Sequence, residues 1–136
     1  MNFRPALALR NQACLNLQAL LDGSGIGAKI TIYGGPQPTA SDSPLGPQNQ
    51  LLVAFPLLLP SFLPPINGTM ALNVPPSVYP TVAGSASFAR WTAANGVVVF
   101  DCDAGAAGTT LLLSSQQISP AVPISIVSFV VVVPAS

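Results

Sequence analysis

The sequence predicts a mainly β protein with a single domain spanning residues 1–136, built as a β-sandwich or jelly-roll-like barrel with one N-terminal α-helix and a proline-rich extended segment. Short runs of strand-forming residues recur between turn residues, which is typical of such folds. Asn95-Gly96, a dipeptide favoured in two-residue type I′ hairpins, lies between two of these runs. Eleven of the fifteen prolines fall within residues 36–80, which predicts a loop and extended arm there.

One helix is predicted, over residues 5–22. Pro5 suits the first helical turn, where its missing N–H is not needed, and Gly23 is suited to the C-cap. Apolar residues recur at spacings of three and four and form one stripe along it: Ala6, Leu9, Ala13, Leu17 and Leu20. We expect this helix to lie against a sheet or a neighbouring molecule.

The remaining elements are strands. They are predicted at 29–33, 51–55, 68–74, 85–92, 96–103, 109–113 and 124–133. Residues 85–134 are expected to form an antiparallel core around Trp91. In the first strand, strict alternation places Ile30 and Ile32 inward and leaves Lys29, Thr31 and Tyr33 outward.

The composition predicts a surface that is covered by other molecules. Half the residues are hydrophobic, only 6% are charged, and the formal net charge is zero. A free domain of this kind would lack the charge repulsion that keeps small proteins apart. Four scattered basic residues disfavour nucleic acid binding. The apolar run 124–133 is too short to cross a membrane as a helix, so no membrane partner is expected.

The sequence contains no histidine and no glutamate. We therefore expect no catalytic residue, no cofactor and no resident metal, and hence no enzyme. Asp101 and Asp103 share one face of a strand, where they could bind a hard cation such as Ca²⁺. The favoured interpretation is a solvated strand end that pairs with Arg90 across the hairpin.

Other polar and sulfur-containing residues favour structural roles. Cys14 and Cys102 are expected to be reduced and buried, although the sequence also permits a bridge between them. Residues 114–117, Ser-Ser-Gln-Gln, could bind a sugar but are predicted as a polar turn. Trp91 and Tyr33 could stack on a ligand, but aromatic residues among valines are more typical of a core or an interface.

Several short stretches carry a resemblance to small virion proteins of tailed bacteriophages. The chain has the Ala/Leu-rich opening helix of that group, then a strand ending Ile32-Tyr33 and a loop with Gly35 and Pro38 at the positions of its Gly-x-x-Pro pattern. The later half is similar as well, at 86–91, at 105–113, at Ile118, and in a closing strand, 127–131, before Pro134. Residues 51–80 are richer in proline than that group leads one to expect.

The resemblance implies a phage structural protein of the head decoration or cement type, at the capsid surface of the virion and made in the cytoplasm of the host bacterium. Its implied partners are the major capsid protein and copies of itself; closed symmetry is expected, and a trimer would suit a threefold or quasi-threefold joint. Two alternatives stay open: a tail or baseplate component, and a carbohydrate- or host-binding β module on the virion surface.

Apolar contacts would hold such a protein in place. The predicted contact residues lie in the proline-punctuated run and, second, on the N-terminal helix: Leu57, Leu58, Leu59, Phe62, Leu63, Leu9, Leu17 and Leu20.

Overall fold

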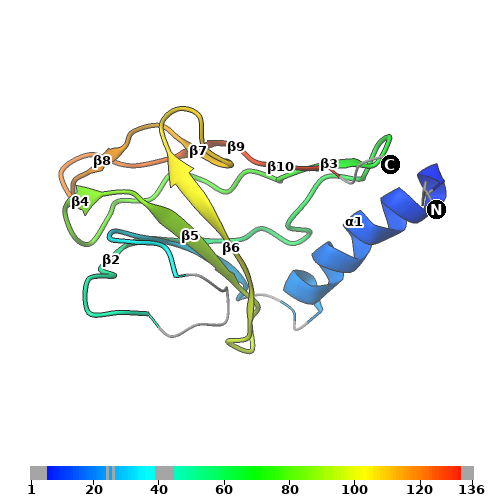
Figure 1. The fold of residues 1–136 in the computed structure, drawn as a ribbon, viewed down its shortest axis with the longest axis horizontal. Coiled ribbons are helices and arrows are strands. Elements are labelled where there is room, and N and C mark those ends of the chain that lie inside the picture. Colours follow the sequence, from blue (N-terminus) through cyan, green and yellow to red (C-terminus); the bar gives the residue numbers. More distant parts are fainter. Residues whose placement is uncertain (1–5, 24, 26, 39–44, 133–136) are drawn as a thin grey trace.

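The protein is mainly β, with one helix near the N-terminus (Figure 1). A computed structural model describes residues 6–23, 25, 27–38 and 45–132. Within them α1 (Leu7–Asp22) precedes ten strands: β1 (Lys29–Tyr33), β2 (Leu51–Pro56), β3 (Thr69–Ala71), β4 (Gly84–Ser85), β5 (Phe88–Thr92), β6 (Val98–Gly105), β7 (Leu111–Leu113), β8 (Gln117–Ile118), β9 (Ile126–Ser128) and β10 (Val130–Val132). The predicted class, a mainly β domain led by one helix, is confirmed.

Six strands form a sheet curled into a half-barrel, in the order β2-β1-β5-β6-β7-β9, and β10-β3 and β4-β8 form two small sheets. The core predicted as antiparallel is mixed, because β6 and β7 run parallel while the other neighbours are antiparallel. The parallel pairing covers only two residue pairs, Ala104 with Leu111 and Gly105 with Leu112. This parallel pairing is so short that the loop 106–110 is long enough to bring β7 back beside the end of β6.

The β5–β6 hairpin forms as predicted, but its turn is not type I′. Gly96 has a φ of +88°, whereas Asn95 is not among the residues with positive φ, and type I′ needs both. The Gly96 N–H donates to the carbonyl oxygen of Ala93 (2.9 Å), and the Ala93 N–H donates to that of Val97 (2.9 Å). The turn is therefore a longer hairpin loop in which glycine alone takes the left-handed conformation.

The core is centred on Trp91, which is fully buried. Its ring lies 4.6 Å from that of Phe129, 4.8 Å from Phe100 and 5.9 Å from Phe62, measured between centroids. Its indole N–H donates to the sulfur of Cys102 (3.4 Å). Rings from four separate segments thus meet at one point, which confirms Trp91 as a core residue.

The proline-rich segment supplies sheet edges. β2 is an edge strand, and β3 pairs with β10 outside the large sheet. Residues 78–81 then link the two ends of the half-barrel: Val78 exchanges two backbone hydrogen bonds with Ile124 just before β9, and the Thr81 N–H donates to the carbonyl oxygen of Leu52 in β2 (3.1 Å). Much of this segment therefore packs on its own domain.

Helix α1 ends at Asp22, as predicted, and Gly23 caps it by donating its N–H to the carbonyl oxygen of Ala19 (2.8 Å). The predicted role of Pro5 lies outside the described residues. The helix lies at the same end of the molecule as β3 and β10 (Figure 1). Within the described parts of the chain, no helix is long and apolar enough to span a membrane.

Candidate functional site

The predicted contact residues of the proline-rich run divide into two groups. Leu58, Leu59 and Leu63 are exposed, so they are available to a partner. Leu57 and Phe62 are buried, and their prediction as contact residues is corrected here, because both belong to the core of the domain itself. The ring of Phe62 packs against Trp91 and Phe129, which an apolar run read from sequence alone does not reveal.

The predicted stripe of α1 is not the face that the helix buries. Cys14 and Leu21 are fully buried and Leu17 is half-buried, whereas Leu9 and Leu20 are 51% and 64% exposed. The buried face and the stripe lie about a quarter turn apart around the helix axis. An apolar stripe of the helix therefore faces outward.

Hydrogen bonds from polar side chains of α1 to segment 61–68 fix this orientation of the helix. The Gly68 N–H donates to Oδ1 of Asn11 (2.8 Å), and the Ser61 N–H donates to Oδ2 of Asp22 (3.1 Å). Nε2 of Gln18 donates to the carbonyl oxygen of Phe62 (3.4 Å). Segment 61–68 lacks sheet partners for these groups, so polar helix residues satisfy them. Asn11, Gln18 and Asp22 recur at helical spacing, which is the signal that the sequence interpretation missed.

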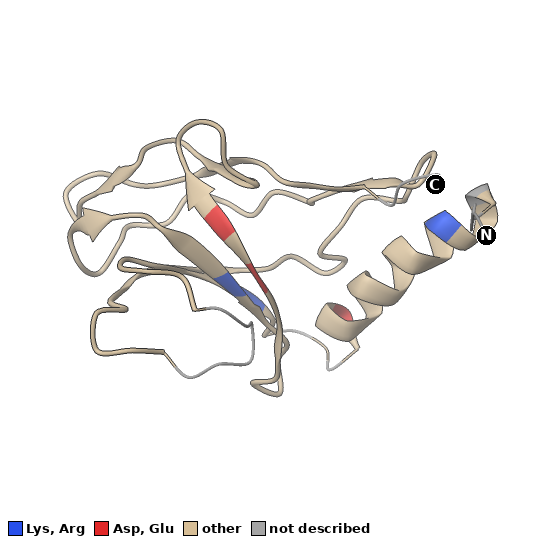
Figure 2. Ribbon diagram, viewed as in Figure 1, with Lys and Arg blue, Asp and Glu red and all other residues tan. Residues whose placement is uncertain are grey.

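We call the exposed side chains on α1 and the adjoining segment the apolar end of the molecule. It comprises Leu9, Leu15, Leu20, Leu58, Leu59, Leu63 and Ile66. The charged residues of the described chain lie on the sheet and on α1, which carries Arg10 and Asp22 (Figure 2). No charged residue occurs in the sequence between Asp42 and Arg90, or after Asp103. Much of the chain thus presents only neutral groups to a partner.

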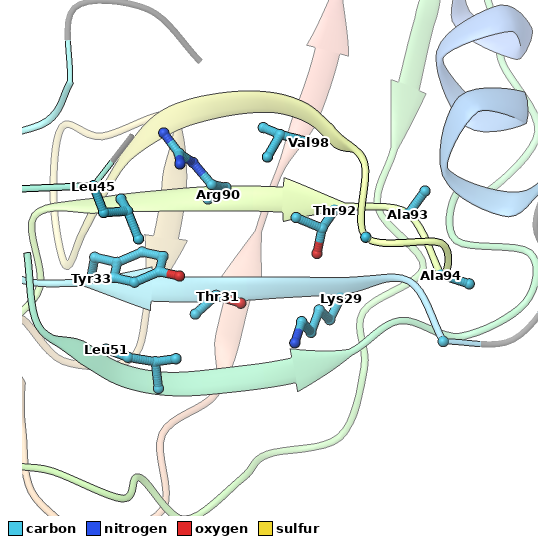
Figure 3. A pocket seen from close by; sticks show the side chains of 12 residues that line it. Lys29, Thr31, Tyr33, Leu45, Leu51, Arg90, Thr92, Ala93, Ala94 and Val98 are labelled. Carbon is cyan, nitrogen blue, oxygen red and sulfur yellow. The ribbon is translucent and has the colours of Figure 1, made fainter. Parts of the chain in front are cut away.

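The charged residues of the sheet lie on its outward side, which we call the polar face. It is formed by β1, β5 and β6: Lys29, Thr31, Tyr33, Arg90, Thr92, Asp101 and Asp103. Figure 3 shows the side chains from β1 and β5 on one side of the strands. Ile30 and Ile32 point inward, as predicted, but Thr31 is buried too, since β1 is a central strand with neighbours on both sides.

Arg90 and Asp101 form a two-pronged ion pair. Nε donates to Oδ1 and Nη2 donates to Oδ2, each at 2.9 Å. The pairing across the hairpin is confirmed, but its expected setting, a solvated strand end, is wrong: the two side chains are 8% and 2% exposed. A buried pair of this geometry matters far more to stability than a surface pair, because removing one partner leaves the other charge in a dry environment.

A groove of about 390 Å³ runs over this face. Its walls include Lys29, Thr31, Tyr33, Leu45, Leu51, Arg90, Thr92 and Val98 (Figure 3). Burial raises the pKa of Tyr33, and the nearby Asp101 adds to this while Arg90 opposes it. The described lining offers hydroxyl and cationic groups but no carboxylate, thiol or imidazole, so it can form hydrogen bonds.

The two aspartates of β6 have different hydrogen-bond partners. Asp101 faces Arg90, whereas Asp103 accepts hydrogen bonds from the hydroxyl and the N–H of Thr110. Among the described residues there is no group of three or more His, Cys, Asp or Glu side chains that could hold a metal ion.

The polar stretch 114–117 is tied into the fold. Nε2 of Gln116 donates to the carbonyl oxygen of Ala86, and its Oε1 accepts from the N–H of Ala106 (3.1 Å). The Ser115 hydroxyl donates to the carbonyl oxygen of Gln117 (2.8 Å) beside a cavity of about 140 Å³. Residues 114–116 lie in the connection that was predicted as a polar turn, whereas Gln117 begins β8.

Both cysteines are free and buried, so the alternative of a bridge does not hold. The sulfur of Cys14 lies 3.7 Å from the carbonyl oxygen of Gly68, whereas Cys102 contacts Trp91. Burial raises the pKa of Cys102 to about 11. A thiol that stays protonated is a poor nucleophile, which favours a structural role.

Comparisons with protein-family models, with curated proteins and with solved structures found no match.

Proposed function

We propose that this chain is a virion structural protein of a tailed bacteriophage, of the head decoration or cement type, which sits at the capsid surface and bridges capsid subunits through apolar contacts. Two independent supports combine here: the resemblance of its short sequence elements to that group, and the apolar end of the molecule. The observation that carries the proposal is the outward orientation of the α1 stripe, with Leu9 and Leu20 exposed.

A surface helix normally turns its apolar stripe toward the core. In α1 the hydrogen bonds of Asn11, Gln18 and Asp22 to segment 61–68 hold a different face inward. Covering these exposed leucines with another molecule would stabilise the complex by roughly 25 cal/mol per Å² of apolar area buried. The helix thus presents a rigid row of side chains to a partner.

Charge favours the same role. A protein that docks through Leu58, Leu59 and Leu63 brings no ionised group of segment 43–89 into the contact. Burial of an ion without a partner would cost several kcal/mol, so a neutral surface is easily covered. Contacts that are weak singly would add up over many copies on one shell. The partners are the major capsid protein and further copies of this chain; a trimeric state remains a prediction.

The test compares particles that carry or lack the protein. Phage heads made without it should lose integrity at a lower temperature, and adding wild-type protein should restore their heat resistance. The variant Leu9→Gln/Leu20→Gln should restore much less. The control is Leu45→Gln, which changes an exposed leucine that lines the groove of the polar face; it should restore resistance fully.

Three results would contradict the proposal. Equal heat resistance of heads with and without the protein would remove the cement role. Only a few copies per particle, measured by quantitative mass spectrometry of purified virions, would indicate a tail or baseplate component. Specific binding of the isolated protein to host glycans would indicate the carbohydrate- or host-binding module.

A further inference from the structure

Within the described residues, strand β10 has a hydrogen-bonded neighbour along one edge only. It pairs with β3 on its other side, and the antiparallel register matches Val130 with Ala71, Val131 with Met70 and Val132 with Thr69. The Leu72 N–H donates to the carbonyl oxygen of Phe129 (2.9 Å), and this bond identifies which alternate residues of the strand hydrogen-bond to β3. Because alternate residues of an antiparallel strand hydrogen-bond to the same neighbour, Phe129 and Val131 direct their backbone groups toward β3. Val130 and Val132 direct theirs away from it.

These outward groups have no partner in the described part of the chain. β7 pairs with β9 and ends its pairing at Ser128, before β10 begins. No hydrogen bond joins the N–H or carbonyl oxygen of Val130 or Val132 to any other described residue. Val130 and Val132 are 45% and 63% exposed, while the side chain of Val131 packs against the core.

Proteins usually protect such an edge by keeping the strand very short, or with a lysine, an inward-pointing charge or a bulge, and β10 has only the first of these, at three residues. Neither β10 nor β3 contains a charged residue, and their pairing shows no register shift. An uncharged edge with free donors and acceptors is a template for another strand.

We propose that β10 pairs in antiparallel register with β10 of a second copy, around a twofold axis through Val131. This axis places Val130 opposite Val132 of the second copy, and both residues direct their backbone groups into the new contact. The pair then forms four backbone hydrogen bonds and a continuous sheet in the order β3-β10-β10-β3. On its outer side each Val130 packs against Val132 of the second copy, a favourable cross-strand pairing of β-branched residues.

The second copy is the occupant that this edge selects. The outward groups lie two residues apart on either side of Val131, so the edge is complementary to itself under a twofold rotation. Neutral valines meet neutral valines, without any charge to desolvate. Two three-residue strands bury far less than the roughly 800 Å² per partner of a standard interface. We therefore expect a weak dimer of the isolated chain that is reinforced where copies are held close together.

This inference deepens the proposed function by naming one contact between copies, which, being twofold, is distinct from the threefold contacts of the predicted trimer, and it is tested on the isolated chain. Loss of the capsid role would leave the dimer intact, and loss of the dimer would leave the apolar end available to a capsid.

The experiment combines sedimentation equilibrium with amide hydrogen exchange, over protein concentrations from about 10 μM to about 1 mM, the range of a weak complex. We expect the mass to rise toward that of a dimer, and the amides of Val130 and Val132 to become protected as it rises. Val132→Pro removes two of the four hydrogen bonds and no bond to β3, so it should raise the dimer dissociation constant by about tenfold or more. Val132→Lys should act in the same direction.

Val122→Lys is the matched control, because Val122 is a valine of similar exposure, 60%, in a loop away from β10. It should leave the dissociation constant unchanged. The inference is overturned if the chain stays monomeric throughout, or if it associates while the amides of Val130 and Val132 exchange equally fast at low and high concentration. Since exchange is measured on the wild-type chain, this outcome stands even if a variant does not fold.

Discussion

On the polar face, charged groups of β5 and β6 have partners within the chain: Arg90 donates two hydrogen bonds to Asp101, and Asp103 accepts from Thr110 in the loop before β7. At the apolar end, leucines on a helix and an irregular segment point outward without a partner. The first region pairs Arg90, Asp101 and Asp103 within one chain, whereas the second leaves apolar area exposed. The contrast teaches that low overall charge conceals two different surfaces, and that the open one is where assembly is expected.

The same contrast holds at the scale of adjacent residues. Leu20 is 64% exposed and Leu21 fully buried, and Leu63 is exposed beside the buried Phe62. Neighbours of the same chemical class therefore serve the interior and the surface in turn. Their substitution separates stability from assembly.

The largest effect is expected from the Phe62–Leu63 pair. Phe62→Ala should lower the free energy of unfolding by about 3–5 kcal/mol, because it opens a cavity beside Trp91 and Phe129. Leu63→Ala should change it by less than about 0.5 kcal/mol. Urea denaturation followed by Trp91 fluorescence measures both. Equal losses would mean that Leu63 belongs to the core as well.

A loss of about 3 kcal/mol is expected for Asp101→Ala, because the buried guanidinium of Arg90 then loses the carboxylate that it grips. The double variant Arg90→Met/Asp101→Leu, which removes both charges, should recover much of the loss. Denaturation curves for both variants provide the measurement. An unchanged midpoint for Asp101→Ala would show that the polar face does not depend on this pair.

Alkaline pH should weaken the fold by about 2 kcal/mol through Cys102. Its pKa in the folded protein is about 11, against about 9 for an unburied thiol. Between these values the unfolded chain releases the proton while the folded chain retains it, so stability is fully present below pH 9 and falls as the pH rises toward 11. Cys102→Ala should show a smaller fall over this range. Identical pH profiles of the two proteins would contradict the assignment.

The smallest effect on stability is expected at the apolar end. Leu9→Gln/Leu20→Gln should alter the free energy of unfolding by less than about 0.5 kcal/mol, because both side chains already contact water. The melting temperature of the isolated protein checks this and also validates the variant for the capsid experiment. A large drop would mean that the stripe is part of the domain's own core.

Local patterns predicted most strands of the large sheet well, whereas the single strand predicted at 124–133 is two strands, β9 and β10, in different sheets. The β1 boundaries, 29–33, follow from strict alternation and turn residues, and β5, β6 and β7 lie within a few residues of the ranges expected for them. The prediction of a type I′ turn was wrong because the register of β5 and β6 shifts by one residue between Trp91 and Thr92. This shift lengthens the loop and overrides the preference of the Asn-Gly dipeptide. The prediction of which face of α1 is buried was wrong because polar helix residues form hydrogen bonds with segment 61–68. Helical periodicity alone contains no information about that distant segment.

The amino-acid sequence by itself determined the mainly β class, the single N-terminal helix, the scarcity of charge and the proline-rich edge, since all of these depend on residue type and on spacing between near neighbours. Only the tertiary structure decided which leucines are core and which are surface, how deeply the Arg90–Asp101 pair is buried, and which edge of β10 stays open. These depend on segments far apart in the chain. Their meeting is set by packing and by hydrogen-bond satisfaction across the whole domain.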